Sequence, residues 1–139
     1  MAATRILALN GSPKGPNGNT EILLKEFLAG VEEAGGEAST VYVKDLRINY
    51  CRGCFSCWNV TPGQCVHKDD FPAVLEQIKQ ADVLVLATPL YHGGMTAMLK
   101  AAVERTLPLN KPYMVVVDGR THHPPREGAG NQKYVLISN

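Results

Sequence analysis

The segment best suited to binding a ligand spans residues 11–21 and reads GSPKGPNGNTE. An apolar run at residues 6–9 precedes it and predicts a short buried strand, while residues 22–31 place apolar side chains at helical spacing. A strand, a polar loop and the start of a helix form an arrangement that binds phosphate. The reason is that the unpaired N–H groups and the dipole at a helix N-terminus both favour negative charge.

Four residues of this segment are candidate ligand contacts. Ser12, Asn19 and Thr20 supply hydroxyl and amide groups, and Gly18 lets the backbone approach a ligand closely. The segment has neither the Gly-Lys-Ser/Thr of a triphosphate loop nor the G-x-G-x-x-G of a dinucleotide site. A single terminal phosphate, as in FMN, therefore suits it best. The simpler alternative is a surface loop whose polar residues only cap the helix.

A second candidate loop, TPLYHGGM, occupies residues 88–95 and follows a continuous apolar strand at residues 83–87. In an open α/β sheet, ligands bind in the crevice at the carboxyl ends of the strands. Tyr91 offers an aromatic face and His92 a polar edge, which is the mixture that a flavin ring requires. The alternatives are that Tyr91 is a core aromatic residue and that His92 is an ordinary loop histidine, and for His92 we favour the ordinary role.

All four cysteines lie close together, with the spacing C-x2-C-x2-C-x7-C formed by Cys51, Cys54, Cys57 and Cys65. Three cysteines at such short spacing can wrap one face of a [4Fe–4S] cluster, with the fourth returning from a distance. Zinc fits less well, because a mononuclear zinc site normally uses two separate pairs of ligands. His67 could serve as a ligand, but it lies too close to Cys65 in the sequence to form such a second pair. Metal-free thiols, or a redox dithiol formed by Cys51 and Cys54, remain open.

Alternating apolar strands and amphipathic helices predict one α/β domain with a parallel sheet. Strands are expected at residues 6–9, 41–43, 83–87 and 134–137, and helices from residue 22 to about 34, at 71–79 and at 95–105. The simplest arrangement is flavodoxin-like, in the order 2-1-3-4, and we expect it to be truncated before a fifth strand. Two long loops, a cysteine-rich one at residues 44–69 and another at 107–132, stay unassigned, although residues 113–117 suit an extra strand or a hairpin arm.

Composition narrows the class of protein. The 139 residues suit a single domain at 1–139, and a net charge of +1 with scattered cations gives no sign of nucleic-acid or membrane-surface binding. No apolar stretch approaches the length of a membrane span, so we expect a cytoplasmic protein. In that compartment the cysteines are more readily thiols or metal ligands than disulfides.

Taken together, these motifs resemble the NADPH-dependent FMN reductases and their flavodoxin-fold relatives, including the iron–sulfur flavoproteins. The resemblance rests on GSPKGPNGNTE, CRGCFSCW with PGQCVHKDD, ADVLVLATPLYHGGMTAMLKAAVER and KYVLIS, and covers most of the chain. It implies reduction of bound FMN by NAD(P)H and release of electrons to a flavin, a quinone or another acceptor. The implied phosphate contacts are Ser12, Lys14, Gly18, Asn19 and Thr20. The implied contacts with the isoalloxazine ring are Pro89, Leu90, Tyr91, His92, Gly93, Gly94 and Met95.

The chain departs from the family pattern in two places. The first loop is one residue longer than the GSPRxxGNT form. Comparison with that form therefore does not decide which of Lys14, Pro16 and Asn17 contacts the phosphate. The third flavin loop of the family follows the fourth strand, where this sequence stops. Either the sequence is a fragment or that side of the flavin lacks support. An apolar strand at residues 134–137, left on a sheet edge, also predicts a homo-oligomer, either a dimer or a tetramer. The alternative is that residues absent from this sequence cover the edge in the full protein.

Two other kinds of function compete with a flavin reductase. An electron carrier like flavodoxin usually has a strong acidic bias, which a net charge of +1 does not provide. An iron–sulfur or metal-binding scaffold without flavin leaves both loops unexplained. We assign no catalytic acid or base, because hydride passes between stacked nicotinamide and flavin rings without one.

Overall fold

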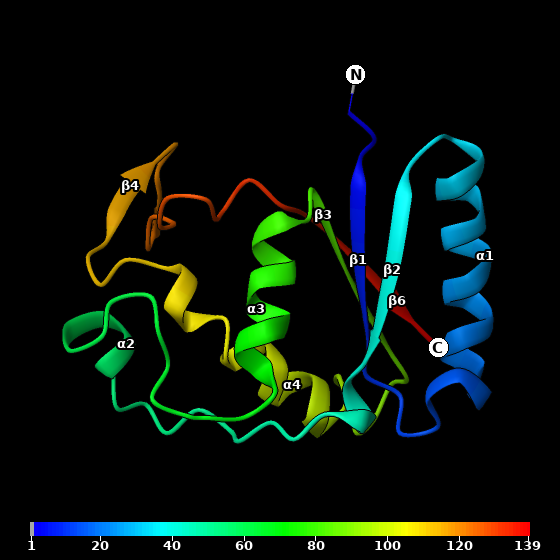
Figure 1. Cartoon of the computed structure of the whole chain (residues 1–139), viewed down its shortest axis with the longest axis horizontal. Coiled ribbons are helices and arrows are strands. Elements are labelled where there is room, and N and C mark those ends of the chain that lie inside the picture. The colour runs from blue at the N-terminus through cyan, green and yellow to red at the C-terminus, as the bar shows by residue number, and fades with distance from the viewer. Residues whose placement is uncertain (1) are drawn as a thin grey trace.

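A parallel four-stranded sheet forms the centre of the computed structural model, which describes residues 2–139 (Figure 1). The strands are β1 (Arg5–Asn10), β2 (Glu37–Tyr42), β3 (Val83–Thr88) and β6 (Lys133–Ser138). Their order is β2-β1-β3-β6 and every neighbouring pair is parallel. With β6 in the fourth place, this confirms the predicted flavodoxin-like order 2-1-3-4.

Helices cover both faces of the sheet (Figure 1). The α-helices are α1 (Asn19–Glu33), α2 (Ser56–Asn59), α3 (Phe71–Gln80) and α4 (Ala97–Glu104). Short 3-10 turns are η1 (Gly15–Asn17), η2 (Val43–Asp45) and η3 (Leu107–Leu109). No helix in the described part of the chain combines the length and the apolar character that crossing a membrane requires.

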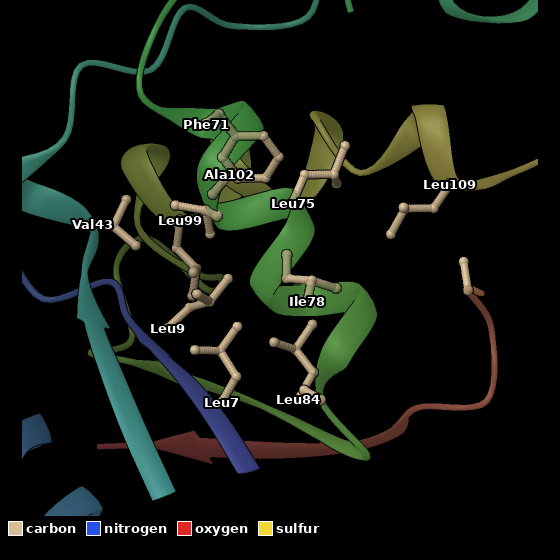
Figure 2. Packing of buried hydrophobic residues seen from close by; sticks show 13 residues of the cluster. Leu7, Leu9, Val43, Phe71, Leu75, Ile78, Leu84, Leu99, Ala102 and Leu109 are labelled. Carbon is tan, nitrogen blue, oxygen red and sulfur yellow. The ribbon is translucent and has the colours of Figure 1, made fainter. Parts of the chain in front are cut away.

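Side chains alternate along the central strands and so divide the core in two. Leu7 and Leu9 of β1 point toward α3 and α4, where they meet Ile78 and Leu99 (Figure 2). The intervening residues of β1 face α1 and pack against Leu24. Because β1 is buried on both faces, its apolar run is continuous, which is the pattern of a central parallel strand.

The observed element bounds differ from the expected ones at β2 and α4, and α1 begins at Asn19 rather than at residue 22. β2 begins at Glu37, four residues earlier than predicted, because it pairs with β1 along its full length. Its sequence, EASTVY, is polar and only partly buried, so its first half gave no apolar signal. α4 begins at Ala97 rather than residue 95, because Thr96 has an extended backbone and caps the helix. The expected C-terminal cap of α1 at residues 34–36 is confirmed.

The two long unassigned segments contain short elements. A turn of helix, α2, lies within residues 44–69. Strands β4 (Val115–Val117) and β5 (Arg120–His122) form an antiparallel hairpin on the side of the molecule opposite α1, so the expected hairpin arm is confirmed (Figure 1). The two segments also touch each other, since the rings of Trp58 and His123 lie 4.9 Å apart. Trp58 Nε1 also donates to the Leu107 carbonyl at 3.3 Å.

Candidate functional site

The two loops proposed as ligand contacts meet at one edge of the sheet. Both follow the carboxyl ends of adjacent parallel strands, β1 and β3. The Gly11 N–H donates to the Ala87 carbonyl at 2.8 Å, and Thr96 Oγ1 donates to the Gly11 carbonyl at 2.7 Å. Backbone and side chain therefore hold the two loops in one fixed relation, at the strand switch point where α/β sheets bind ligands.

Local polar contacts shape the first loop. Asn10 Oδ1 accepts from the Ser12 N–H at 2.9 Å, which turns the chain directly after β1. Ser12 Oγ in turn accepts from the Lys14 N–H at 3.2 Å. At Gly18 an added Cβ would lie 2.9 Å from Ser12 Oγ and 3.0 Å from Lys14 Cβ, so the loop leaves no room for a side chain there.

The start of α1 is open to a ligand. Gly18 is the N-cap residue of α1, and no side chain caps the helix there. The first N–H groups of the helix are therefore not occupied by a capping side chain and can bind a ligand. The side chains of Lys14 and Asn19 are exposed beside it, whereas Ser12 and Thr20 are buried. Thr20 Oγ1 donates to Asn139 Oδ1 at 2.7 Å. The structure thus brings the five phosphate candidates together, with the Thr20 hydroxyl turned toward Asn139.

The buried carboxylate of Glu21 connects the start of this loop to the end of β2. Glu21, in the first turn of α1, accepts from Asn10 Nδ2 and from the Tyr42 hydroxyl, both at 2.8 Å. Burial raises the pKa of Tyr42, and its bond to Glu21 adds to that effect. Asn10 and Tyr42 were not predicted as part of the site. The signal in the sequence was an asparagine directly after an apolar strand, and in the structure Asn10 is fully buried and therefore needs partners.

The second loop forms a tight turn that stands clear of the core. Tyr91 and Gly94 exchange backbone hydrogen bonds at 2.9 and 3.0 Å, and the two residues between them, His92 and Gly93, have φ of 47° and 79°. Positive φ at both central positions defines a type I′ turn. Leu90 and Tyr91 are 61% and 51% exposed, so Tyr91 is not a core residue. The remaining candidates are half-buried or exposed along the same loop, namely Pro89 and Met95 (half-buried) and His92, Gly93 and Gly94 (exposed).

Thr96 connects the second loop to the first and also caps α4, because its hydroxyl oxygen accepts from the Leu99 N–H at 3.3 Å while donating to Gly11. We expect Thr96→Val to lower the free energy of unfolding by about 1–3 kcal/mol, through loss of a cap and an unpaired buried carbonyl. Urea unfolding measures this loss. The exposed Thr61→Val is the control, with a change below about 0.5 kcal/mol. Equal effects of the two substitutions would contradict the bridging role.

The cysteine-rich loop begins at the carboxyl end of β2 and runs along the same edge of the sheet to α2 (Figure 1). Cys57 is buried, Cys51 and Cys65 are half-buried and Cys54 is exposed, and all four are free thiols. Burial raises the pKa of the Cys57 thiol, and the charges of Cys65, Cys51 and Cys54 raise it further. Hydrogen bonds from Ser56 lower the pKa of the Cys54 thiol.

The chemistry of the four cysteines suits a thiolate-ligated iron–sulfur cluster, because all four candidate ligands on this loop are sulfur. Among residues 2–139, no three Cys, His, Asp or Glu side chains are grouped closely enough to form a ready-made metal site. Binding would therefore require the loop to close around the group. Cys57 lies in α2, and Cys54 lies two residues before that helix begins. This short turn can bring the two cysteines together.

A buried ion pair, which the sequence analysis missed, lies at the base of this loop. Arg105 Nη1 donates to Asp69 Oδ2 at 2.6 Å and Nη2 donates to Asp69 Oδ1 at 3.1 Å. The two side chains are 1% and 2% exposed. The only signal in the sequence was an arginine at the end of an apolar helix, and nothing there identifies its partner 36 residues away.

Comparisons with known proteins show which sequences and structures this chain is similar to. The sequence profile of the family described as NADPH-dependent FMN reductase matches residues 4–127. The chain is 36% identical to an iron–sulfur flavoprotein of Methanocaldococcus jannaschii over 76% of this chain and 53% of that protein. It is 38% identical to an iron–sulfur flavoprotein of Archaeoglobus fulgidus over 73% of this chain and 48% of that protein. It thus spans about half the length of these relatives.

Solved structures support the fold. An FMN-dependent NADH-azoreductase from Bacillus anthracis, solved in complex with FMN, superposes with a TM-score of 0.66. The comparison covers 97% of this chain and 68% of that protein at 16% sequence identity. At that identity the likeness concerns the fold, which is an α/β fold with a parallel sheet.

Proposed function

The chain belongs to the NADPH-dependent FMN reductase family, and we propose that it binds FMN and passes electrons from NAD(P)H through the flavin to an acceptor. The observation that carries this proposal is the joining of two ligand loops at one sheet edge through Gly11, Ala87 and Thr96. A flavin mononucleotide has a phosphate for the first loop and a flat ring for the second, and the loops offer matching groups to each.

In the proposed complex the phosphate lies at the open N-terminus of α1. Lys14 and Asn19 are exposed there and supply a cation and an amide, and the helix dipole adds attraction for the anion. Ser12 and Gly18 shape the loop by their close approach. Thr20 would join the phosphate contacts by exchanging its bond to Asn139 for one to the ligand.

The ring lies along the turn at residues 89–95, where Tyr91 offers an exposed aromatic face. The backbone N–H groups of His92 and Gly93, at the tip of the turn, suit the polar rim of a heterocycle. Bound FMN supplies the ring atoms that accept hydride from nicotinamide. The protein's own part is to orient that ring and exclude water from one face, so no acid or base is assigned.

We further propose that Cys51, Cys54, Cys57 and Cys65 bind a [4Fe–4S] cluster. Support comes from the all-sulfur donor set on one loop and from the names of the two iron–sulfur flavoprotein relatives. We also propose a cytoplasmic protein, because cysteines that ligate a cluster suit a reducing compartment.

The decisive test is an absorption spectrum of anaerobically purified protein, followed by NAD(P)H oxidation with added FMN and a quinone. Flavin bands with turnover support the reductase. Flavin bands without NAD(P)H turnover would favour an electron carrier. A broad cluster absorption without flavin would favour a metal-binding scaffold and remove the FMN assignment.

Gly94 allows the ring position to be tested without disturbing the fold. A Cβ added there has no atom within 4 Å, and Gly94 does not have positive φ, in contrast to Gly93 at 79°. We expect Gly94→Val to fold normally but to weaken FMN binding at least about tenfold, which is about 1.4 kcal/mol, because the side chain occupies the space of the ring. Calorimetric titration with FMN measures this. Unchanged affinity would place the ring elsewhere.

We also propose a homo-oligomer. Tyr134 and Leu136 of β6, on the face opposite α1, are 67% and 65% exposed, and β6 is an edge strand. A second copy covering this face would bury both side chains. Light scattering at tens of micromolar decides, since a monomer at that concentration would contradict the proposal. The electron acceptor, a flavin, a quinone or another molecule, is left to kinetic screening.

A further inference from the structure

Arg105 holds the two ends of the cysteine-rich loop together. It lies at the C-terminal cap of α4, and its side chain is 1% exposed. Its Nη1 donates to the Asn49 carbonyl, two residues before Cys51, at 2.6 Å. The same guanidinium binds the carboxylate of Asp69, four residues after Cys65, through both terminal nitrogens. One side chain thus contacts both sides of the segment that carries every cysteine.

Asp69 completes this closure from the other side. Its carboxylate accepts from the Asn49 N–H at 2.8 Å and from the Phe71 N–H at 3.2 Å. The next pair outward is formed by Arg47 and Asp70, where the Asp70 N–H donates to the Arg47 carbonyl at 3.1 Å. The loop is therefore closed at its base by a buried ion pair before any metal is bound.

One donor of Arg105 remains free. Nε is a fully buried side-chain nitrogen without a hydrogen-bond partner among residues 2–139. Buried donors in folded proteins are nearly always paired, so this N–H needs an acceptor. Cys65 is the nearby candidate, because it lines the same cavity of about 370 Å³ as Arg105.

We propose that Arg105 is a positioning residue that closes the cysteine loop and reserves its Nε–H as a donor to the sulfur of cluster-bound Cys65. This inference rests on the proposed cluster. A hydrogen bond to a ligating sulfur withdraws electron density and makes a cluster easier to reduce, and the nearby positive charge acts in the same direction. The Arg105 side chain would thus determine both the shape of the cysteine loop and the reduction potential of the cluster.

The test compares Arg105→Lys with Arg126→Lys. Arg126 is a matched control because it also contacts the cysteine loop, but through the Cys57 carbonyl at 3.4 Å rather than through sulfur. Both proteins are reconstituted anaerobically with iron and sulfide, and the cluster is titrated by electron paramagnetic resonance. Arg105→Lys keeps a positive charge. The single ammonium group of lysine cannot form both hydrogen bonds to the Asp69 carboxylate and also donate to Cys65, as the arginine guanidinium can. We expect its midpoint potential to shift to more negative values, with no shift for Arg126→Lys.

Two further readouts keep the inference falsifiable. Amide hydrogen exchange in residues 49–69 should be faster in metal-free Arg105→Lys than in the wild type. In the wild type labelled with 15N in its arginine guanidinium groups, hyperfine spectra of the reduced cluster should reveal a coupled 15N nucleus, even if Arg105→Lys takes up no cluster. Cluster loading with an unchanged potential and no such coupling would overturn the donor contact. Absence of iron and sulfide from the wild type would instead overturn the proposed cluster, and the donor contact with it.

Discussion

Asp69→Ala should lower the free energy of unfolding by about 3–5 kcal/mol, since it leaves Arg105 as a buried and unpaired cation. The two side chains are 2% and 1% exposed, so water cannot replace the lost carboxylate. The Asn49 N–H also loses its acceptor at 2.8 Å. Urea unfolding of the metal-free protein gives the difference directly, without any dependence on a bound cofactor.

The matched control is Asp45→Ala. Asp45 also forms an ion pair, with Lys44, but its side chain is 57% exposed. Surface pairs of this kind contribute little, so we expect a change of about 0.5 kcal/mol or less. A loss at Asp69 as small as that at Asp45 would mean that Arg105 finds another partner or reaches water, and the closed base of the loop would be wrong.

The same carboxylate predicts how stability depends on pH. Burial alone would raise the pKa of Asp69, but the hydrogen bonds from Arg105, Asn49 and Phe71 outweigh it and hold the pKa well below its usual range. A depressed folded pKa means that the stabilisation is complete above the unfolded value, about 3.9, and is lost as the pH falls below it. We expect wild type to lose stability below about pH 4, and Asp69→Ala to lack this contribution. Parallel acid titrations of both proteins should therefore converge toward low pH.

The sequence predicted those parts of the molecule whose signals are local. The runs at residues 6–9 and 83–87 are apolar because β1 and β3 are buried on both faces, and such runs need no knowledge of partners. The alternation of these strands with helices then restricted the sheet order to the one observed. The two ligand loops followed, because loops after adjacent parallel strands must meet at one edge.

The parts that escaped prediction depend on distant partners or on partial burial. Half of β2 was missed because its polar face is exposed and its pairing with β1 carries no apolar signal. The pairing of Arg105 with Asp69 joins residues far apart in sequence, and neither residue type reveals the other. Thr96 was passed over although a threonine before an apolar helix is a capping signal. The assignment of individual residues to FMN atoms and to the cluster stays a prediction.

Gly11→Ala should be the most damaging small substitution in the ligand loops. A Cβ at Gly11 would lie 2.6 Å from Leu99 Cβ, a contact closer than real side chains tolerate, and Leu99 is fully buried in α4. The backbone at Gly11 does not have positive φ, so the cost is steric rather than conformational. We expect the free energy of unfolding to fall by about 1–3 kcal/mol or more, with weaker FMN binding, because the loop must move away from α4.

Gly30→Ala is the matched control, with the opposite expected sign. Gly30 lies inside α1, and its added Cβ has no atom within 4 Å, so alanine should stabilise the helix by about 0.5–1 kcal/mol. The double variant Gly11→Ala with Leu99→Ala tests the cause further. Alanine at position 99 keeps the Cβ atom, which is the atom nearest to the Cβ added at position 11. The clash and the weakened FMN binding should therefore persist in the double variant. Full recovery of FMN affinity in the double variant would show that the outer Leu99 side chain, at 3.0 Å and beyond, governs the loop instead.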